Sequence, residues 1–470
     1  MNPKNPLCLL AHSALCVAVV FGAAGCQATR YALQMPFPGP DPGKASAQRQ
    51  KDRLELANNV MAITWKVADG RMTPDLLTDR INHSTLEMGD ELFELISADG
   101  SHFRSSDMHI IGAPRISRLA VVPNSPRLAD RYGGKQIVVK FEDSTGNLAA
   151  EWRSELRDGA NYVRQVVTLR AQRSDIPIQD LVLIHLAEPS AKQMGTVDGS
   201  PVVARHFFFG CEHPMARNMA GFPSRDIGTW GPSQVSFPDH TQLRWDLADQ
   251  VDGVGKYEIL FEYTGGDHRL EIFRVALLEG DQEIAHDEHF GATGMAHVNN
   301  RYELDLAHHT PHAIYTLVAE VRSDGGTDSR GTVSMTHHKG IRRIRAALPQ
   351  NVSLRPGESI AQSSVVGVVP AGQLRRGFLY YIERQRAHPY RPFLHYNSWY
   401  DIGYFSKFDE ADCLRVINTY GRELVEKRGV ILDSFLFDDG WDDHKSLWSF
   451  HQGLPQGFTP IRWATATYGA

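Results

Sequence analysis

The feature that most constrains the fold is a stretch near the end of the 470-residue chain, residues 391–443. It opens with an aromatic-rich extended run, Phe393–Trp399, and closes with a short apolar run, Phe435–Phe437. Between them, Asp409–Lys427 repeats apolar residues at helical spacing, and Gly429 follows as a helix stop. A strand, a crossover helix and a second strand predict one parallel βα unit.

Both predicted strands end in side chains that suit a sugar ring. Trp399 ends the first strand, and Asp438, Asp439 and Trp441 follow the second. Functional groups collect at the carboxyl ends of parallel strands, where an aromatic ring can stack on C–H groups and carboxylates can bind hydroxyls. Gly440 can supply the turn that brings both carboxylates to one ligand. We predict substrate binding by these four residues; the simpler interpretation is a solvated acidic turn that caps the next helix.

Two segments resemble a known family. NSWYDIG (397–403) followed by FLFDDGWDD (435–443) resembles the first two barrel strands of the alpha-galactosidase, or melibiase-type, glycoside hydrolases. Gly199–Ala216 resembles a segment of the β-sandwich that precedes the barrel in bacterial members. The resemblance implies that Trp399 lies at the sugar subsite and that Asp438-Asp439 holds the hydroxyls of a terminal α-galactosyl unit.

The composition is that of a folded globular protein, with 42% hydrophobic and 22% charged residues. Its length predicts two to four domains. A net charge of -6 and the lack of a basic run argue against a nucleic-acid partner. We predict no cofactor, because two carboxyl groups suffice for glycoside hydrolysis. We predict no metal site, because the scattered His286, His289 and His297 lack the close pair spacing of metal ligands. The predicted partner is a galactose-containing glycan.

The N-terminal region predicts export. Residues 1–26 combine Lys4, an apolar core and small residues before Cys26, which resembles a bacterial lipoprotein signal with Cys26 as the lipidated residue. The alternative is an ordinary secretory signal that is cut nearby. Residues 27–53 are rich in Pro, Gly, Gln and Ser, and predict a flexible tether. The expected location is the periplasm or outer membrane of a bacterium, with membrane attachment only through the lipid.

Most of the remaining chain predicts antiparallel β-structure. Short period-two runs separated by turn signals predict an N-terminal β-sandwich over 54–223, completed by 339–384. Residues 224–338 predict an inserted jelly-roll-like β-sandwich, which either binds carbohydrate or acts as a spacer. Arg375–Arg384 fits a helical linker, although its aromatic residues also suit a strand. The fold class is therefore mostly β.

Two smaller features lie within these domains. Glu212-His213-Pro214 stands at a strand-to-loop change and either makes a local His–carboxylate contact or, by the resemblance, reaches over the sugar site. Cys211 and Cys413 fall in different predicted domains, and we expect both thiols to be unpaired.

Residues 385–470 predict the start of a (β/α)8 barrel with two βα units. Only 80 residues follow Tyr390, whereas a whole barrel needs about 250. In the resembled family the nucleophile follows the fourth strand and the acid/base follows the sixth, so no catalytic residue is predicted here. We expect the front part of a retaining exo-α-galactosidase or α-N-acetylgalactosaminidase. The alternatives are a non-catalytic carbohydrate-binding lipoprotein and a galactosyl-transferring relative.

Overall fold

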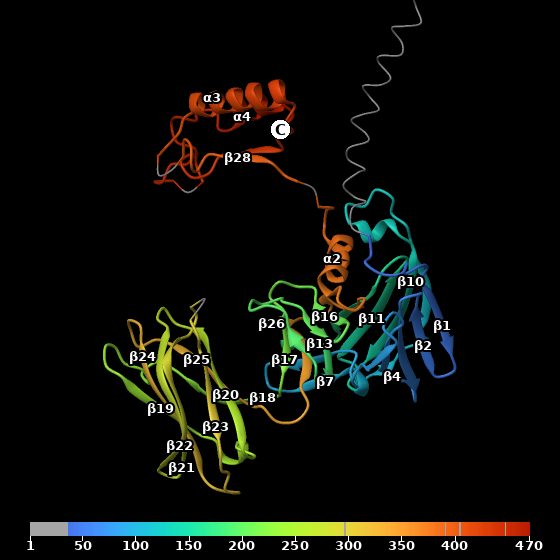
Figure 1. Cartoon of the computed structure of the whole chain (residues 1–470), viewed down its shortest axis with the longest axis vertical. Helices are drawn as coiled ribbons and strands as arrows, with labels where there is room; N and C mark the ends of the chain where they lie inside the picture. The colour runs from blue at the N-terminus through green and yellow to red at the C-terminus, as the bar shows by residue number, and fades with distance from the viewer. Residues whose placement is uncertain (1–35, 296–297, 391, 404–405, 447) are drawn as a thin grey trace, which may run out of the picture. The chain divides into compact units, whose positions relative to one another are not determined.

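The structure, a computed structural model, describes residues 36–295, 298–390, 392–403, 406–446 and 448–470 (Figure 1). The predicted mostly β fold is confirmed, since antiparallel sheets dominate it. The chain divides into two compact units, and the second begins at Pro389. The predicted signal and Cys26 lie outside the described residues. Within the described ranges, no helix has the length and apolar character that crossing a membrane requires.

Three sheets form the first β-domain. The first sheet follows chain order: β1 (Ser46–Gln50), β2 (Arg53–Ala57), β3 (Met61–Ala68), β4 (Arg71–Asp79) and β5 (Ser84–Glu87). The second runs β14 (Lys192–Gln193), β15 (Val202–Ala204), β16 (Phe207–Cys211), β27 (Ser359–Val368), β12 (Tyr162–Ala171), β11 (Leu148–Arg157), β10 (Gly134–Glu142) and β8 (His109–Ile110), with β9 (Arg115–Leu119) also on β10. The third runs β17 (Arg217–Gly221), β26 (Arg343–Leu354), β13 (Ile176–Ala187), β6 (Glu94–Ser97) and β7 (His102–Arg104).

Period-two alternation builds the core of this domain. Along β11 every second residue is buried, so one face packs inward and the other is partly exposed. Trp152 of β11 meets Trp65 of β3 edge to face, with ring centroids 5.0 Å apart. The strands β26 and β27 come after residue 340 and pair with β13 and β12, so the chain returns to this domain after a long excursion.

The predicted tether over 27–53 is wrong in its C-terminal part. Strand β1, Ser46–Gln50, pairs antiparallel with β2. Ala45 belongs to the hydrophobic core, and Phe37 packs against that core and against Tyr380. Four of the five β1 residues are exposed, and its side-chain bonds to β2 are polar ones, from Ser46 to the Ala57 oxygen and from Gln48 to Glu55. A polar strand of this kind has no apolar alternation for sequence analysis to detect.

The linker before the second unit is a helix, α2 (Leu374–Gln385), and not a strand. Its buried Arg384 anchors it to the first β-domain. The guanidinium lies 4.2 Å from the ring centroid of Tyr132, and its Nη2 donates to the backbone oxygen of Asp158 at 2.7 Å. Stacking and hydrogen bonding compensate the cost of burying this charge.

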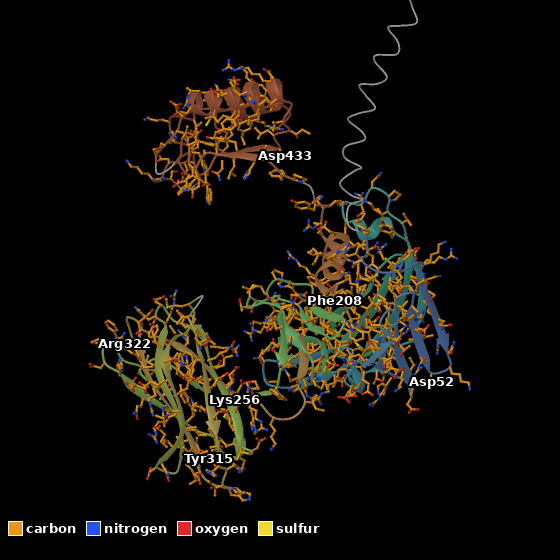
Figure 2. All side chains as sticks on the ribbon, in the orientation of Figure 1. Asp52, Phe208, Lys256, Tyr315, Arg322 and Asp433 are labelled. Atoms are coloured by element: carbon orange, nitrogen blue, oxygen red, sulfur yellow. The ribbon has the colours of Figure 1, made fainter. Side chains whose placement is uncertain are left out.

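Residues 224–338 form two four-stranded antiparallel sheets around a separate core. One sheet runs β18 (Ser224–Trp230), β25 (Arg330–His337), β20 (Gly255–Gly265) and β23 (Arg301–Leu306). The other runs β19 (Thr241–Asp246), β24 (Tyr315–Ser323), β21 (Leu270–Glu279) and β22 (Gln282–Ala292). On β24 the buried Tyr315 and the half-exposed Arg322, labelled in Figure 2, illustrate the alternation of inward and outward positions.

The second unit contains the predicted strand–helix–strand. Strands β28 (His395–Asn397) and β29 (Ser434–Leu436) pair in parallel. Between them lies α3 (Glu410–Tyr420), which continues as one π-helical segment, Gly421–Glu426. The last helix, α4 (Thr459–Thr467), packs on α3 around Cys413, Ile417 and Ile461.

Local sequence explains where α3 begins. The Asp409 carboxylate accepts from the backbone N–H of Asp412, and the Asp412 side chain accepts from that of Asp409, which makes a capping box. Cys413 and Cys211 are both buried and free, as predicted. Burial raises the pKa of each thiol to about 12, so neither is a reactive thiolate at neutral pH.

Asp75 is a buried carboxylate on β4 that holds three strands together. It accepts from Thr64 Oγ1 at 2.9 Å, and its oxygens lie 2.7 Å from Arg53 Nη2 and 3.0 Å from Lys66 Nζ. Burial by itself disfavours the charged carboxylate, but the hydrogen bonds from Lys66 and Thr64 and the charge of Arg53 outweigh it and lower the pKa of Asp75.

This lowered pKa predicts an acid-dependent contribution to stability. A carboxyl whose pKa is lower in the folded protein stabilises it above the unfolded pKa, near 3.9, and that contribution is lost as the pH falls through the folded value. Asp75→Asn is therefore expected to unfold at lower urea concentration than the wild type at pH 7, with a difference that shrinks toward pH 3. Tryptophan fluorescence would follow the unfolding. The exposed Asp69→Asn serves as control, and a difference for Asp75→Asn that is the same at both pH values would contradict the assignment.

Candidate functional site

One buried serine joins the carboxyl ends of the two parallel strands. Ser398 follows β28, and its backbone N–H donates to the Leu436 oxygen of β29 at 3.0 Å. Its Oγ accepts from the backbone N–H of Asp438 at 2.8 Å. Ser398 is fully buried. The predicted site residues Trp399 and Asp438 are therefore brought together, because one follows Ser398 in sequence and the other is hydrogen-bonded to it.

The opposite end of the strand pair is closed by a reciprocal contact. Asp433, labelled in Figure 2, accepts through Oδ2 from the backbone N–H of Leu394 at 2.8 Å. Its own backbone N–H donates to the Leu394 oxygen at 2.7 Å. Each strand has only three residues, so the strand pair has few hydrogen bonds of its own. The contacts of Asp433 and Ser398 add hydrogen bonds at its two ends.

The loop after β28 folds tightly around Ser398. The Ser398 carbonyl accepts from the backbone N–H groups of Asp401, Ile402 and Gly403, at 2.9–3.1 Å. A Cβ at Gly403 would come within 2.9 Å of the Asp439 backbone oxygen. The loops that follow the two strands are therefore in contact.

Gly440 turns the chain after the carboxylate doublet, as predicted. Its φ is +112°, and a Cβ there would lie 2.4 Å from the Ser406 oxygen, so a side chain is disfavoured on both counts. The Asp438 Oδ1 accepts from the backbone N–H of Asp439 at 2.9 Å. Asp438 is half-buried and Asp439 is exposed, so the two carboxylates have different surroundings.

Trp441 lies in an aromatic cluster. Its ring centroid is 5.9 Å from Trp448, 5.3 Å from Phe450 and 6.0 Å from Phe458. Trp441 and Trp399 are both half-buried, whereas Trp448 is 72% exposed. Trp441 therefore packs against the loop that follows it, and its role at a ligand stays a prediction.

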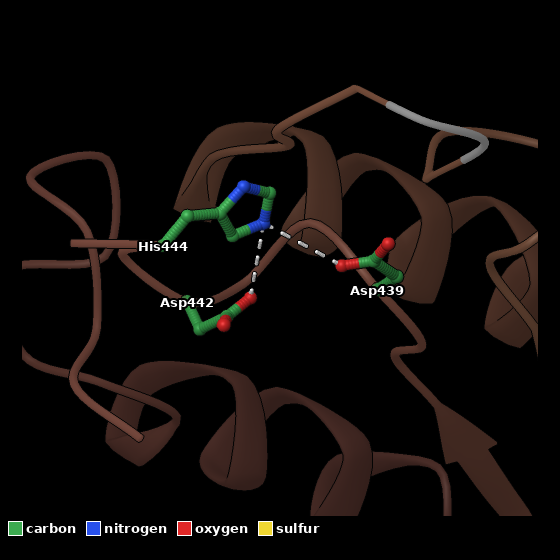
Figure 3. Close-up of side chains that lie close together, drawn as sticks. All are labelled: Asp439, Asp442 and His444. Atoms are coloured by element: carbon green, nitrogen blue, oxygen red, sulfur yellow. Dashed lines mark ion pairs between the residues drawn. The ribbon is translucent and has the colours of Figure 1, made fainter. Parts of the chain in front are cut away.

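His444 lies beside the carboxylates of Asp439 and Asp442 (Figure 3). Its Nε2 is 3.8 Å from Asp439 Oδ1 and 3.7 Å from Asp442 Oδ1, and the three ligand atoms lie within 4.8 Å of one another. Two carboxylates and an imidazole are a donor set that divalent metal ions accept. Both Asp439 and His444 are exposed, so the same arrangement also describes loose surface ion pairs.

The central residue of β28, Tyr396, is buried and contacts the loop that follows this strand. Tyr396 is 4% exposed, and its hydroxyl donates to Asp401 Oδ2 at 2.7 Å. Burial and the adjacent Asp401 raise the pKa of Tyr396 well above its usual range. The phenol therefore stays neutral and keeps Asp401 in the loop around Ser398.

The known proteins with a similar structure include α-galactosidases. No family model matches the chain, and no curated protein matches it significantly. Among solved structures, the GH36 α-galactosidase AgaB from Geobacillus stearothermophilus is similar with a TM-score of 0.42 and 14% identity, over 90% of this chain and 55% of that one. The α-galactosidase from Lactobacillus brevis gives 0.42 and 13%, over 89% and 53%.

A variant of AgaA from G. stearothermophilus, solved in complex with stachyose, gives a TM-score of 0.40 and 12% identity, over 91% of this chain and 55% of that one. Each of these three solved structures is of an α-galactosidase. The chain spans about half the length of these proteins.

The role of Ser398 can be tested by its removal. Ser398→Ala leaves the Asp438 N–H without its partner, at a cost of about 1–3 kcal/mol. We expect the amides of residues 430–443 to exchange with solvent about tenfold faster or more, measured by hydrogen-exchange mass spectrometry. The exposed Ser406→Ala is the matched control. Unchanged exchange in Ser398→Ala would show that the hydroxyl does not hold the strand ends together.

Proposed function

We propose that the chain is the substrate-holding front part of a retaining, exo-acting glycoside hydrolase. Its substrates are glycans that end in α-galactosyl or α-N-acetylgalactosaminyl residues. Asp438 and Asp439 bind the hydroxyls of the terminal ring, and Trp399 covers its C–H face. Trp441 borders the same ring from its aromatic cluster.

One observation carries this proposal: the parallel pairing of β28 and β29 sets Trp399 beside Asp438 through the hydrogen bond between Ser398 Oγ and the Asp438 N–H. An aromatic ring and a carboxylate at adjacent strand ends match the two unlike surfaces of a sugar. The backbone turns at Gly440, so Asp439 is not forced to the opposite face of an extended strand. The sequence resemblance of 397–403 and 435–443 to the first two barrel strands of α-galactosidases supports the same assignment.

Asp438 and Asp439 act here by orientation. Glycoside hydrolysis uses a nucleophile and an acid/base on either side of the scissile bond, and we assign neither role to this doublet. Charge-assisted hydrogen bonds from two hydroxyls fix the ring in one position. A ring held in that way lowers the entropic cost of bringing its anomeric carbon to a nucleophile.

The binding of methyl α-D-galactopyranoside to the full chain tests this proposal. Asp439→Asn keeps the size of the side chain but removes its charge, so we expect about tenfold or more weaker binding in a calorimetric or NMR titration. Asp443→Asn is the matched control, since Asp443 has a similarly exposed carboxylate on the same loop. We expect that control to bind like the wild type.

Equal affinity of the wild type and Asp439→Asn would contradict the assignment of Asp439. Trp399→Ala provides an independent check on the ring-stacking part, and it should weaken binding without changing the secondary structure measured by circular dichroism. If only Asp443→Asn lost affinity, the sugar site would lie away from Asp438 and Asp439.

A further inference from the structure

The first β-domain contains an open pocket of about 260 Å³ that the strand-end site does not explain. Its walls come from the loop after Gly199, the end of β16 with the loop that follows it, and one face of α2. The apolar part of the lining consists of Pro201, Phe209, Pro214, Val365, Phe378 and Ile382. Phe378 packs edge to face against Phe208, labelled in Figure 2, with ring centroids 5.3 Å apart.

An unsatisfied amide lines this pocket. Asn218 is 2% exposed, and its Oδ1 accepts from the backbone N–H of Cys211 at 2.9 Å. This bond fixes the orientation of the amide, and its Nδ2 has no hydrogen-bond partner. A Cβ at Gly210 would lie 3.2 Å from that nitrogen, so glycine leaves room for it. A buried N–H donor without a partner is uncommon and costs free energy unless a ligand accepts from it.

Glu212 brings a carboxylate to the same pocket. It pairs through Oε2 with Arg164 Nε, and its Oε1 accepts from the Tyr381 hydroxyl at 2.8 Å. Arg164 Nη2 also donates to Ser363 Oγ at 3.0 Å. A carboxylate has about four acceptor positions, so Glu212 keeps capacity for a further donor. Since Arg164 balances its charge, the pocket favours a neutral ligand over an ion.

The adjacent histidine adds a second donor. His213 Nδ1 accepts from the backbone N–H of Met215 at 3.1 Å, so the ring proton of the neutral form is on Nε2. The predicted local contact between His213 and a carboxylate is replaced by the pairing of Glu212 with Arg164 and Tyr381. Two N–H donors and one carboxylate therefore line the pocket beside apolar side chains.

We propose that this pocket binds a single neutral pyranose unit. Each sugar hydroxyl both donates and accepts, so it can satisfy the Asn218 amide and bond to Glu212. The C–H face of the ring then lies on the Phe378 side of the pocket. The site goes beyond the proposed strand-end function, because no residue of the second unit contributes to it.

Saturation-transfer NMR on the full chain with methyl α-D-galactopyranoside, methyl α-D-glucopyranoside and methyl α-D-mannopyranoside tests this inference. The background is Asp438→Asn/Asp439→Asn, which removes the strand-end carboxylates. We expect at least one pyranoside to bind this background, and Asn218→Leu to weaken that binding about tenfold.

A second variant keeps the test valid if Asn218→Leu does not fold. Ile382→Trp places a large ring in the pocket wall without touching a polar group, and we expect it to abolish the signal. Ile341→Trp makes the same change at an exposed isoleucine outside the pocket lining, and it should bind like the background.

Either of two results overturns the inference. The first is that no pyranoside binds the Asp438→Asn/Asp439→Asn chain while the wild type does, which leaves the strand-end function intact. The second is a signal that persists unchanged in Ile382→Trp. Equal pyranoside binding by the wild type and the Asp438→Asn/Asp439→Asn chain, lost from both on Ile382→Trp, would instead support the pocket and contradict only the proposed function.

Discussion

The candidate site depends on a hydrogen bond between one serine hydroxyl and one backbone amide. Ser398 belongs to the loop after β28, yet its Oγ accepts from the first residue of the carboxylate doublet after β29. The paired strands have three residues each, so their ladder contains few bonds. Because Ser398 is fully buried, this bond is shielded from competition with water. It brings the residues Trp399 and Asp438 to the same end of the strand pair.

In the first β-domain, buried charged groups have partners from several different elements. Asp75 and Arg384 are both almost fully buried, and each is surrounded by partners from other strands or loops. These partners hold neighbouring elements together, although the Arg384 Nε has no hydrogen-bond partner. Asn218 differs because its Nδ2, which carries both amide N–H donors, has no hydrogen-bond partner and the residue lines a pocket. The combination of an unpartnered amide and an open pocket is what singles out the region beside α2.

Much of the fold could be predicted from local patterns. Alternating burial along β11 and helical spacing in α3 are visible in the sequence, and Gly440 marks the turn that the structure shows. What could not be predicted depends on distant residues. β1 is polar and joins its sheet through backbone bonds and through the Ser46 and Gln48 side chains. Gly421 opens the π-helical segment where a Cβ would meet the Tyr468 ring at 2.4 Å.

The candidate sites show the same difference between local sequence patterns and contacts between distant residues. The aromatic and acidic residue types of Trp399, Asp438 and Asp439 indicated a sugar site. Ser398 carried no signal, because a serine in a polar turn is common and its partner lies 40 residues away. Glu212 was noticed beside His213, but its actual partner Arg164 is 48 residues away on β12. Sequence reasoning therefore finds candidate ligand-binding groups more readily than the groups that position them.

A crystal structure of the chain soaked with a saturating concentration of methyl α-D-galactopyranoside tests the central claim most directly. The account predicts one sugar ring at the ends of β28 and β29, with hydroxyls within about 2.5–3.0 Å of the Asp438 and Asp439 carboxylates. The ring of Trp399 should lie against its C–H face. Well-ordered strand ends without bound sugar, or a ring that contacts neither carboxylate, would contradict it.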